Sequence, residues 1–165
     1  MNRFAAVAFL CATLPGCNAD KREAEALVRA YNEAAIVAYR TRAFEGLQQT
    51  ATRKEWGRVV VLVDLKSAND LVLESELQAL EIASVQKLSD DLMKVGTRER
   101  WRYWDRPLKP GAPAGTVFVA DMTLSYDFVR EDGRWKMSSA RTLTNEYLEP
   151  AGFSLAPHGS DAGSQ

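Results

Sequence analysis

Apolar and polar residues alternate most clearly between residues 117 and 143, and this alternation predicts two antiparallel strands. In the first half, every second residue is apolar and most residues between them are polar or acidic. The apolar series consists of Phe118, Ala120, Met122, Leu124, Tyr126 and Phe128. Asp132-Gly133 then favours a two-residue type I′ turn, because both central residues of that turn need a positive φ. The pattern predicts a hairpin with one apolar face, which Trp135 and Met137 continue after the turn.

A helical spacing of apolar residues occupies the region before the sheet. Over Asp20–Thr50, alanine, leucine, valine and tyrosine residues recur at intervals of three and four, as on the buried face of a helix. Gly46 is expected to end or bend this helix. A second helix is predicted over Arg53–Leu65 with Thr52 as its cap, although the β-branched run at 59–63 is also compatible with a strand.

Two further strands are predicted between the second helix and the hairpin. One lies within Glu76–Lys87, where both faces are partly apolar, and the other covers Lys94–Asp105. A turn at residues 89–91 separates them, and the proline-containing segment 107–113 is a loop. The predicted fold class is therefore α+β, with two N-terminal helices packed on a curved antiparallel sheet of about four strands.

The apolar face of this sheet carries the residues most suited to a ligand pocket. A two-residue turn sets Glu131 opposite Arg134 and, by the same count, Phe128 opposite Met137 and Leu124 opposite Arg141. The candidate pocket residues are Glu99, Trp101, Tyr103, Tyr126 and Arg141. Because a lone buried charge is costly, Glu99 and Arg141 are expected either to pair at the rim or to face a polar opening.

The opposite face is a ladder of basic and acidic residues. It carries Arg98, Arg100, Arg102 and Trp104 beside the acidic residues Asp121 and Asp127. One interpretation is a solvated face with weak cross-strand ion pairs. The other is a face for a protein partner or a second copy of the chain, since arginine and tryptophan are enriched at interfaces.

The first residues, MNRFAAVAFLCATLPGC, have the charged start and short apolar run of a signal peptide. Leu14-Pro15-Gly16-Cys17 resembles the lipobox of bacterial lipoproteins, which implies that Cys17 becomes the acylated first residue of the mature chain. The alternatives are an ordinary secretory signal cleaved near Ala19 and a signal segment that is retained as an anchor. In each case the folded part lies in the cell envelope outside the cytoplasm, and Asn18 favours the outer membrane, facing the periplasm, if the organism has one.

These features divide the 165 residues into four segments. They are a signal peptide (1–16), a lipid-anchored linker (17–20), one folded domain (21–150) and a disordered tail (151–165). The formal net charge of -1 and the lack of a basic run argue against a nucleic-acid partner. No cofactor, metal site or catalytic motif is evident, and the single histidine, His158, lies in the tail.

The segment YDFVREDGRWKM, at residues 126–137, resembles the final hairpin of nuclear-transport-factor-2-like α+β cones, including the intermembrane-space domain of plastid-division proteins. That superfamily contains ketosteroid isomerases and polyketide cyclases, and also non-catalytic binding and assembly modules. A binding or assembly module without catalytic activity is one function that stays open. The alternative is a pocket for a small apolar ligand, or an isomerase- or cyclase-type enzyme that uses Glu99 and a tyrosine. The first is favoured, because the predicted cone contains no histidine.

Overall fold

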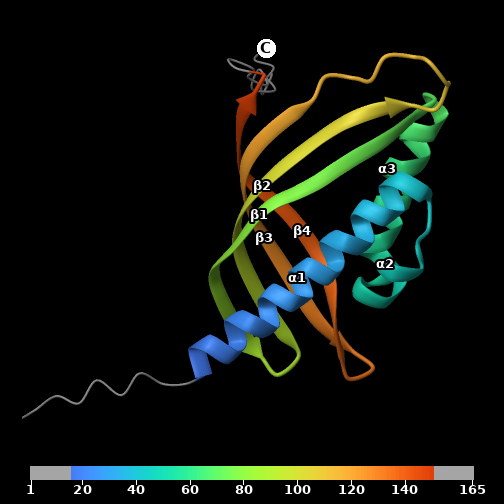
Figure 1. The fold of residues 1–165 in the computed structure, drawn as a ribbon. Coiled ribbons are helices and arrows are strands. Elements are labelled where there is room, and N and C mark those ends of the chain that lie inside the picture. Colours follow the sequence, from blue (N-terminus) through green and yellow to red (C-terminus); the bar gives the residue numbers. More distant parts are fainter. Residues whose placement is uncertain (1–15, 151–165) are drawn as a thin grey trace, which may run out of the picture.

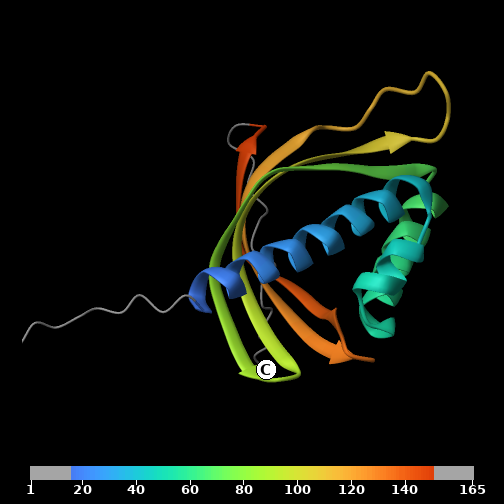
Figure 2. The same ribbon diagram turned by 60° about the horizontal axis from the view of Figure 1, so that its bottom comes forward.

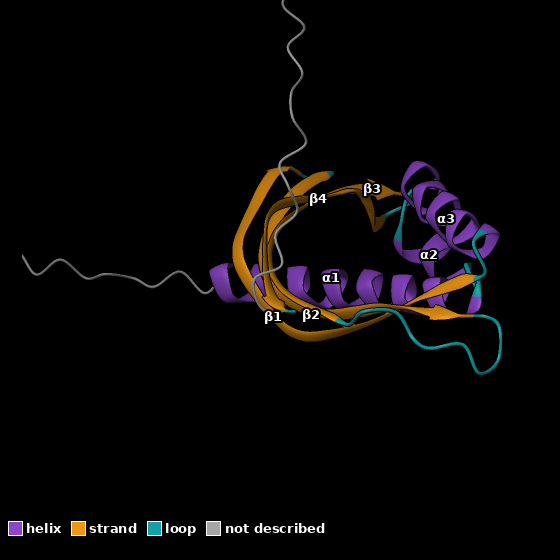
Figure 3. Cartoon of the chain, turned by 90° about the horizontal axis from the view of Figure 1, so that it is seen from above, coloured by secondary structure: helices purple, strands orange, loops and turns teal. Residues whose placement is uncertain are grey.

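A strongly curved sheet of four antiparallel strands forms the body of the protein (Figure 1). The computed structural model describes residues 16–150, so the predicted signal peptide and tail lie outside the described residues. The strands are β1 (Leu71–Ser89), β2 (Leu92–Pro107), β3 (Phe118–Glu131) and β4 (Arg134–Glu149), and they neighbour one another in chain order. Three helices lie on the concave side of the sheet, which curls around them when seen from above (Figure 3). The predicted α+β class with a curved antiparallel sheet is confirmed.

The predicted helix over 20–50 is two helices in the structure, α1 (Gly16–Thr41) and α2 (Glu45–Thr50). The break comes at Arg42, which has a φ of 62° in the left-handed region that ends helices. Gly46, expected to end the helix, lies inside α2 instead. A Cβ on Gly46 would lie 3.1 Å from the Cβ of Ala34, so glycine here permits α2 to pack closely on α1.

Residues 17–20, expected to form a linker, belong to the start of α1. This helix crosses the concave side of the sheet, and its beginning lies near the turn between β1 and β2 (Figure 2). Lys87 Nζ at the end of β1 lies 2.6 Å from an oxygen of Asp20 and 3.4 Å from one of Glu23. These two ion pairs hold the start of α1 against the end of the sheet where β1 turns into β2.

Helix α3 (Arg53–Ala68) begins as the sequence predicts. The Thr52 side chain accepts a hydrogen bond from the backbone N–H of Glu55 at 3.4 Å, which satisfies one free donor of the first turn. Val59 and Val63 are buried while Val61 is 68% exposed, so the β-branched run follows helical periodicity. The strand alternative for this run is therefore wrong.

The central hairpin has the predicted turn. Asp132 and Gly133 have φ values of 52° and 73°, and Glu131 pairs with Arg134 and Phe128 with Met137. The other strands are longer than expected, because β1 begins at Leu71 and the ends of β2 extend beyond residues 94–105.

The expected position of Arg141 on the apolar face is wrong. A bulge beyond the Phe128–Met137 pair shifts the register by one residue, so Arg141 faces Ser125 and Leu124 faces Thr142. One extra residue reverses the side on which every later side chain lies. Arg141 therefore lies on the polar face, where its Nη2 donates to Asp127 at 3.0 Å. The predicted rim pair between Glu99 and Arg141 does not form.

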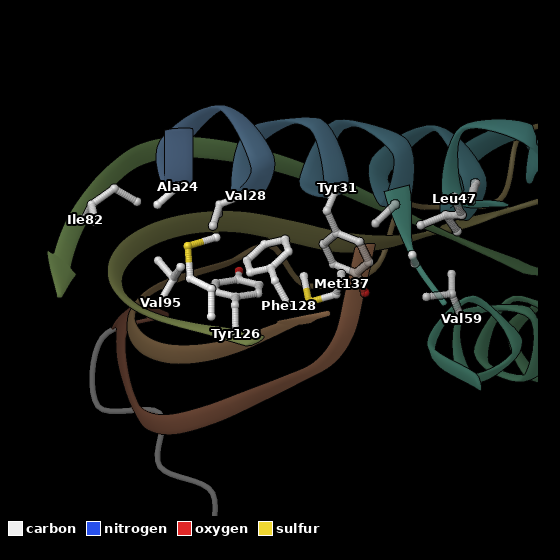
Figure 4. Packing of buried hydrophobic residues seen from close by; sticks show 14 of the residues in the cluster. Ala24, Val28, Tyr31, Leu47, Val59, Ile82, Val95, Tyr126, Phe128 and Met137 are labelled. Atoms are coloured by element: carbon white, nitrogen blue, oxygen red, sulfur yellow. The ribbon is translucent and has the colours of Figure 1, made fainter. Parts of the chain in front are cut away.

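The hydrophobic core lies between α1 and the concave face of the sheet (Figure 4). Val28 of α1 packs toward Val95 of β2 and toward Tyr126 and Phe128 of β3, all of which are at most 2% exposed. Met137 of β4 is fully buried and its carbonyl accepts a 2.8 Å hydrogen bond from the backbone N–H of Thr52. The connection between α2 and α3 is thereby joined to the sheet.

Glu74 links α1 to two strands and makes stability depend on pH. Its carboxylate accepts 2.7 and 2.8 Å hydrogen bonds from Arg40 and Arg106. Burial works to raise the pKa of Glu74, but the hydrogen bonds from Arg106 and Arg40 outweigh it and lower the pKa below its ordinary value. A lowered pKa contributes stability above the ordinary glutamate value, and this contribution is lost as the pH falls through the folded-state pKa.

We expect Glu74→Gln to reduce the free energy of unfolding by about 1–2 kcal/mol near neutral pH. The difference from the wild type should begin to shrink as the pH falls below the ordinary glutamate pKa of about 4.3, and it should be lost once the pH has passed the lower pKa of Glu74 in the folded state. Urea unfolding of both proteins across this pH range measures the difference in the free energy of unfolding. Glu76→Gln is the matched control, since the Glu76 side chain is 48% exposed in its pair with Arg102; equal pH dependence in both variants would contradict the assignment.

Candidate binding cavity

A cavity of about 410 Å³ lies between α1 and the inner face of the sheet. Its wall draws on α1, α3 and all four strands, and none of the lining side chains carries a charge. Five of them are aromatic: Tyr31, Tyr39, Trp101, Tyr103 and Tyr126. The polar atoms of the wall come from these tyrosines and from Asn32, Ser75 and Thr142. The size and the mostly apolar lining are those of a small-molecule site.

Glu99 lies behind this wall, 3% exposed, and accepts hydrogen bonds from neutral groups. Thr97 Oγ1 and Tyr126 OH lie 2.7 and 2.8 Å from Oε1. Trp101 Nε1 lies 2.6 Å from Oε2, and Asn32 Nδ2 makes a longer contact of 3.5 Å with the same oxygen. A carboxylate has about four acceptor positions, so these donors fill them.

The two tyrosine hydroxyls that donate to buried carboxylates, Tyr126 to Glu99 and Tyr31 to Glu55, remain protonated. Burial raises the pKa of Tyr126 far above its ordinary value, and the negative charge of Glu99 raises it further. Burial likewise raises the pKa of Tyr31, and the neighbouring Glu55 adds to the effect. Both hydroxyls therefore act as hydrogen-bond donors, and neither is suited to accept a proton from a substrate.

Another buried carboxylate, Glu55 of α3, is 4% exposed and contacts the cavity wall through Tyr31. It accepts a 3.1 Å hydrogen bond from Tyr31 OH, and Arg58 Nη1 lies 3.1 Å from its other oxygen. Glu55 is not among the site residues predicted from the sequence, although its position three residues after Thr52 fits a capping box. Asn32, a polar residue on the buried face of α1, is also not among them, although periodicity could have revealed it.

Of the predicted pocket residues, Trp101, Tyr103 and Tyr126 line the cavity. Glu99 is not part of the lining, but it accepts hydrogen bonds from Trp101 and Tyr126. Arg141 is not part of the lining either, since it pairs with Asp127 on the other face. Within residues 16–150, no group of three or more histidine, cysteine, aspartate or glutamate side chains could hold a metal ion. No helix in that same range is long and apolar enough to cross a membrane.

Each arginine of the polar face has an acidic partner on a neighbouring strand. Arg100 makes two hydrogen bonds to Asp121, at 2.7 and 2.8 Å. The corresponding pairs, Arg98 with Glu81 and Arg102 with Glu76, are looser at 3.4 and 3.2 Å. Arg102 also lies over the ring of Trp104, 4.6 Å from its centroid. A hollow of about 620 Å³ lies over this face, and both arginines that line it, Arg98 and Arg100, are already paired within the chain.

Several solved structures share this fold, whereas no family model and no curated protein matches the sequence. The intermembrane-space region of the chloroplast protein ARC6 is 18% identical, with a TM-score of 0.67, and the match covers 74% of this chain and 95% of that one. The hexachlorocyclohexane dehydrochlorinase LinA-type3 from Novosphingobium barchaimii LL02 is 13% identical, with a TM-score of 0.50, covering 85% and 99%. LinA type 2 is 13% identical with a TM-score of 0.51, covering 86% and 99%. The chain therefore has the nuclear-transport-factor-2-like α+β fold.

Proposed function

We propose that the protein is a binding module without catalytic activity, held at a membrane of the cell envelope by lipid on Cys17. The observation that carries the proposal is the surroundings of Glu99, the carboxylate that the isomerase alternative needs. Neutral donors occupy its acceptor positions, and it lies behind the cavity wall with 3% exposure. A general base must reach the proton that it removes, so this arrangement suits binding better than proton transfer.

The cavity is the part of the molecule best suited to that binding. It is uncharged along its wall and large enough for a small organic molecule. On the polar face, by contrast, the arginines that would meet a partner already pair with acidic residues. ARC6 and the LinA enzymes show that one fold accommodates both a plastid-division domain and dehydrochlorinases, so the fold alone does not choose between them.

The lipid anchor would attach the domain to a membrane through the start of α1, whereas the cavity is lined by α1 residues from Tyr31 onward. Cys17 lies in the first turn of α1, the helix that forms one wall of the cavity. No flexible segment would separate an acylated Cys17 from the folded domain. The proposed location is the periplasmic side of an outer membrane, if the organism has one.

Co-purification of small molecules tests the proposal. We expect the protein extracted from its own membranes to retain at least one compound, and Ala140→Trp to reduce that retention about tenfold by filling the cavity. Leu143→Trp is the matched control, because Leu143 lies on the same strand, is 62% exposed and is outside the cavity. Mass spectrometry of the extracted compounds measures the retention. Equal retention by the wild type and Ala140→Trp would overturn the proposal.

A further inference from the structure

We propose that the cavity takes an amphiphilic organic cation, with an alkylated ammonium head beside Trp101 and Glu99 and a chain that runs toward Ser75. The inference rests on the proposed function, since it identifies the chemical class of ligand for the same cavity. Three separate features of the described residues lead to it: an uncompensated charge, an aromatic wall and an unpartnered hydroxyl.

The charge is that of Glu99. No lysine or arginine within residues 18–150 forms an ion pair with it, and none lines the cavity. The other two buried carboxylates among the described residues are compensated. Arg58 pairs with Glu55, and both Arg40 and Arg106 pair with Glu74. Burying a carboxylate without a cation is costly, even when neutral donors satisfy its hydrogen bonds. The resulting potential attracts a cation into the cavity and repels an anion.

The aromatic wall suits a cation that donates no hydrogen bond. Trp101 is half-buried, lines the cavity and donates its indole N–H to Glu99 at 2.6 Å, which makes the ring face more electron-rich. Tyr31 and Tyr126 lie close by with their ring centroids 6.4 Å apart. Cations, including quaternary ammonium groups, bind over such ring faces. Because the acceptor positions of Glu99 are filled, a quaternary ammonium loses nothing by lacking an N–H.

The unpartnered hydroxyl is that of Ser75. This residue is 8% exposed and lines the cavity, and its Oγ has no hydrogen-bond partner. Buried polar atoms are normally paired, so a polar atom of a ligand is the natural partner. Ser75 pairs with Tyr103 across the sheet, four residues beyond Glu99, which places it about 13 Å along the strand at about 3.3 Å per residue. A chain with a polar atom at its far end fits this spacing.

Calorimetric titration of the full-length protein in mild detergent tests the head group with three probes: hexyltrimethylammonium, hexanol and hexanoate. We expect the ammonium ion to bind the wild type about tenfold or more tightly than hexanol, and hexanoate not to bind. Glu99→Gln should lower the ammonium affinity about tenfold and leave hexanol unchanged. Trp101→Leu should also lower the affinity for the ammonium ion while leaving that for hexanol unchanged. If Glu99→Gln does not fold, Trp101→Leu takes its place in the test.

The same titration tests the far end of the cavity. A terminal hydroxyl on decyltrimethylammonium, whose extended chain is long enough to span the distance to Ser75, should raise its affinity for the wild type about fivefold, and this gain should vanish in Ser75→Ala. An equal gain in both proteins would overturn the role of Ser75.

The possible failures are distinguishable. If hexanol and the ammonium ion bind equally well and Ala140→Trp abolishes both, the cavity binds ligands but the cationic head group is wrong. If Ala140→Trp leaves the binding of every probe and of every co-purifying compound unchanged, the proposed function fails as well.

Discussion

Replacing Phe128 by alanine is expected to lower the free energy of unfolding by about 3–5 kcal/mol, the usual cost of truncating a buried phenylalanine. Phe128 is 2% exposed and packs between α1 and β4, with its ring centroid 6.5 Å from that of Tyr126. Truncation removes apolar contacts and leaves a cavity next to the fully buried Met137. A loss of this size is a large part of the total stability of a domain of this length.

Chemical unfolding in urea measures the effect. Leu143→Ala is the control, because this residue of the same hairpin is 62% exposed and should change the stability by less than about 0.5 kcal/mol. Similar losses in both variants would contradict the placement of the core between α1 and the sheet.

Replacing Cys17 by alanine is expected to remove every acyl chain from the protein and to release it from the membrane fraction. Each buried methylene of a lipid chain contributes about 0.8 kcal/mol to membrane binding, so more than one chain gives stable attachment. The wild-type mass should equal that of residues 17–165 plus the acyl groups, and the variant should lack the added mass.

Cys11→Ala provides the control for this experiment. Cys11 lies in the predicted signal peptide, so its replacement should leave both the mature mass and the membrane attachment unchanged. A wild-type mass without acyl groups, or a mature chain that begins after Cys17, would contradict the lipid anchor.

Short-range patterns in the sequence predict the central hairpin correctly next to its turn. The Asp132-Gly133 turn specifies its own backbone geometry, and the register next to it follows by counting. The count fails beyond Met137, because a bulge adds one residue and leaves no mark in the alternation of apolar residues. The misplacement of Arg141 follows from that single residue. The break at Arg42 has a similar origin, since arginine gives no signal for a left-handed conformation.

The candidate site is only half visible in the sequence. Glu99, Trp101 and Tyr103 share a face by strand alternation, which local pattern reveals. Asn32 approaches Glu99 only because α1 crosses the concave side of the sheet, a tertiary arrangement that no local pattern specifies. For the same reason, the sequence predicts that Glu99 needs an ion-pair partner or a polar opening, whereas the structure surrounds its carboxylate with neutral hydrogen-bond donors.

The central claim is that the cavity, and not the polar face, is the binding site. The most direct test follows the indole N–H signals of the four tryptophans by NMR while hexyltrimethylammonium is added. Of these, Trp101 alone lines the cavity among the residues described, whereas Trp104 lies under Arg102 on the polar face. We expect the Trp101 signal to shift in a saturable manner while those of Trp56, Trp104 and Trp135 change little. A saturable shift of Trp104 with Trp101 unmoved would contradict the account.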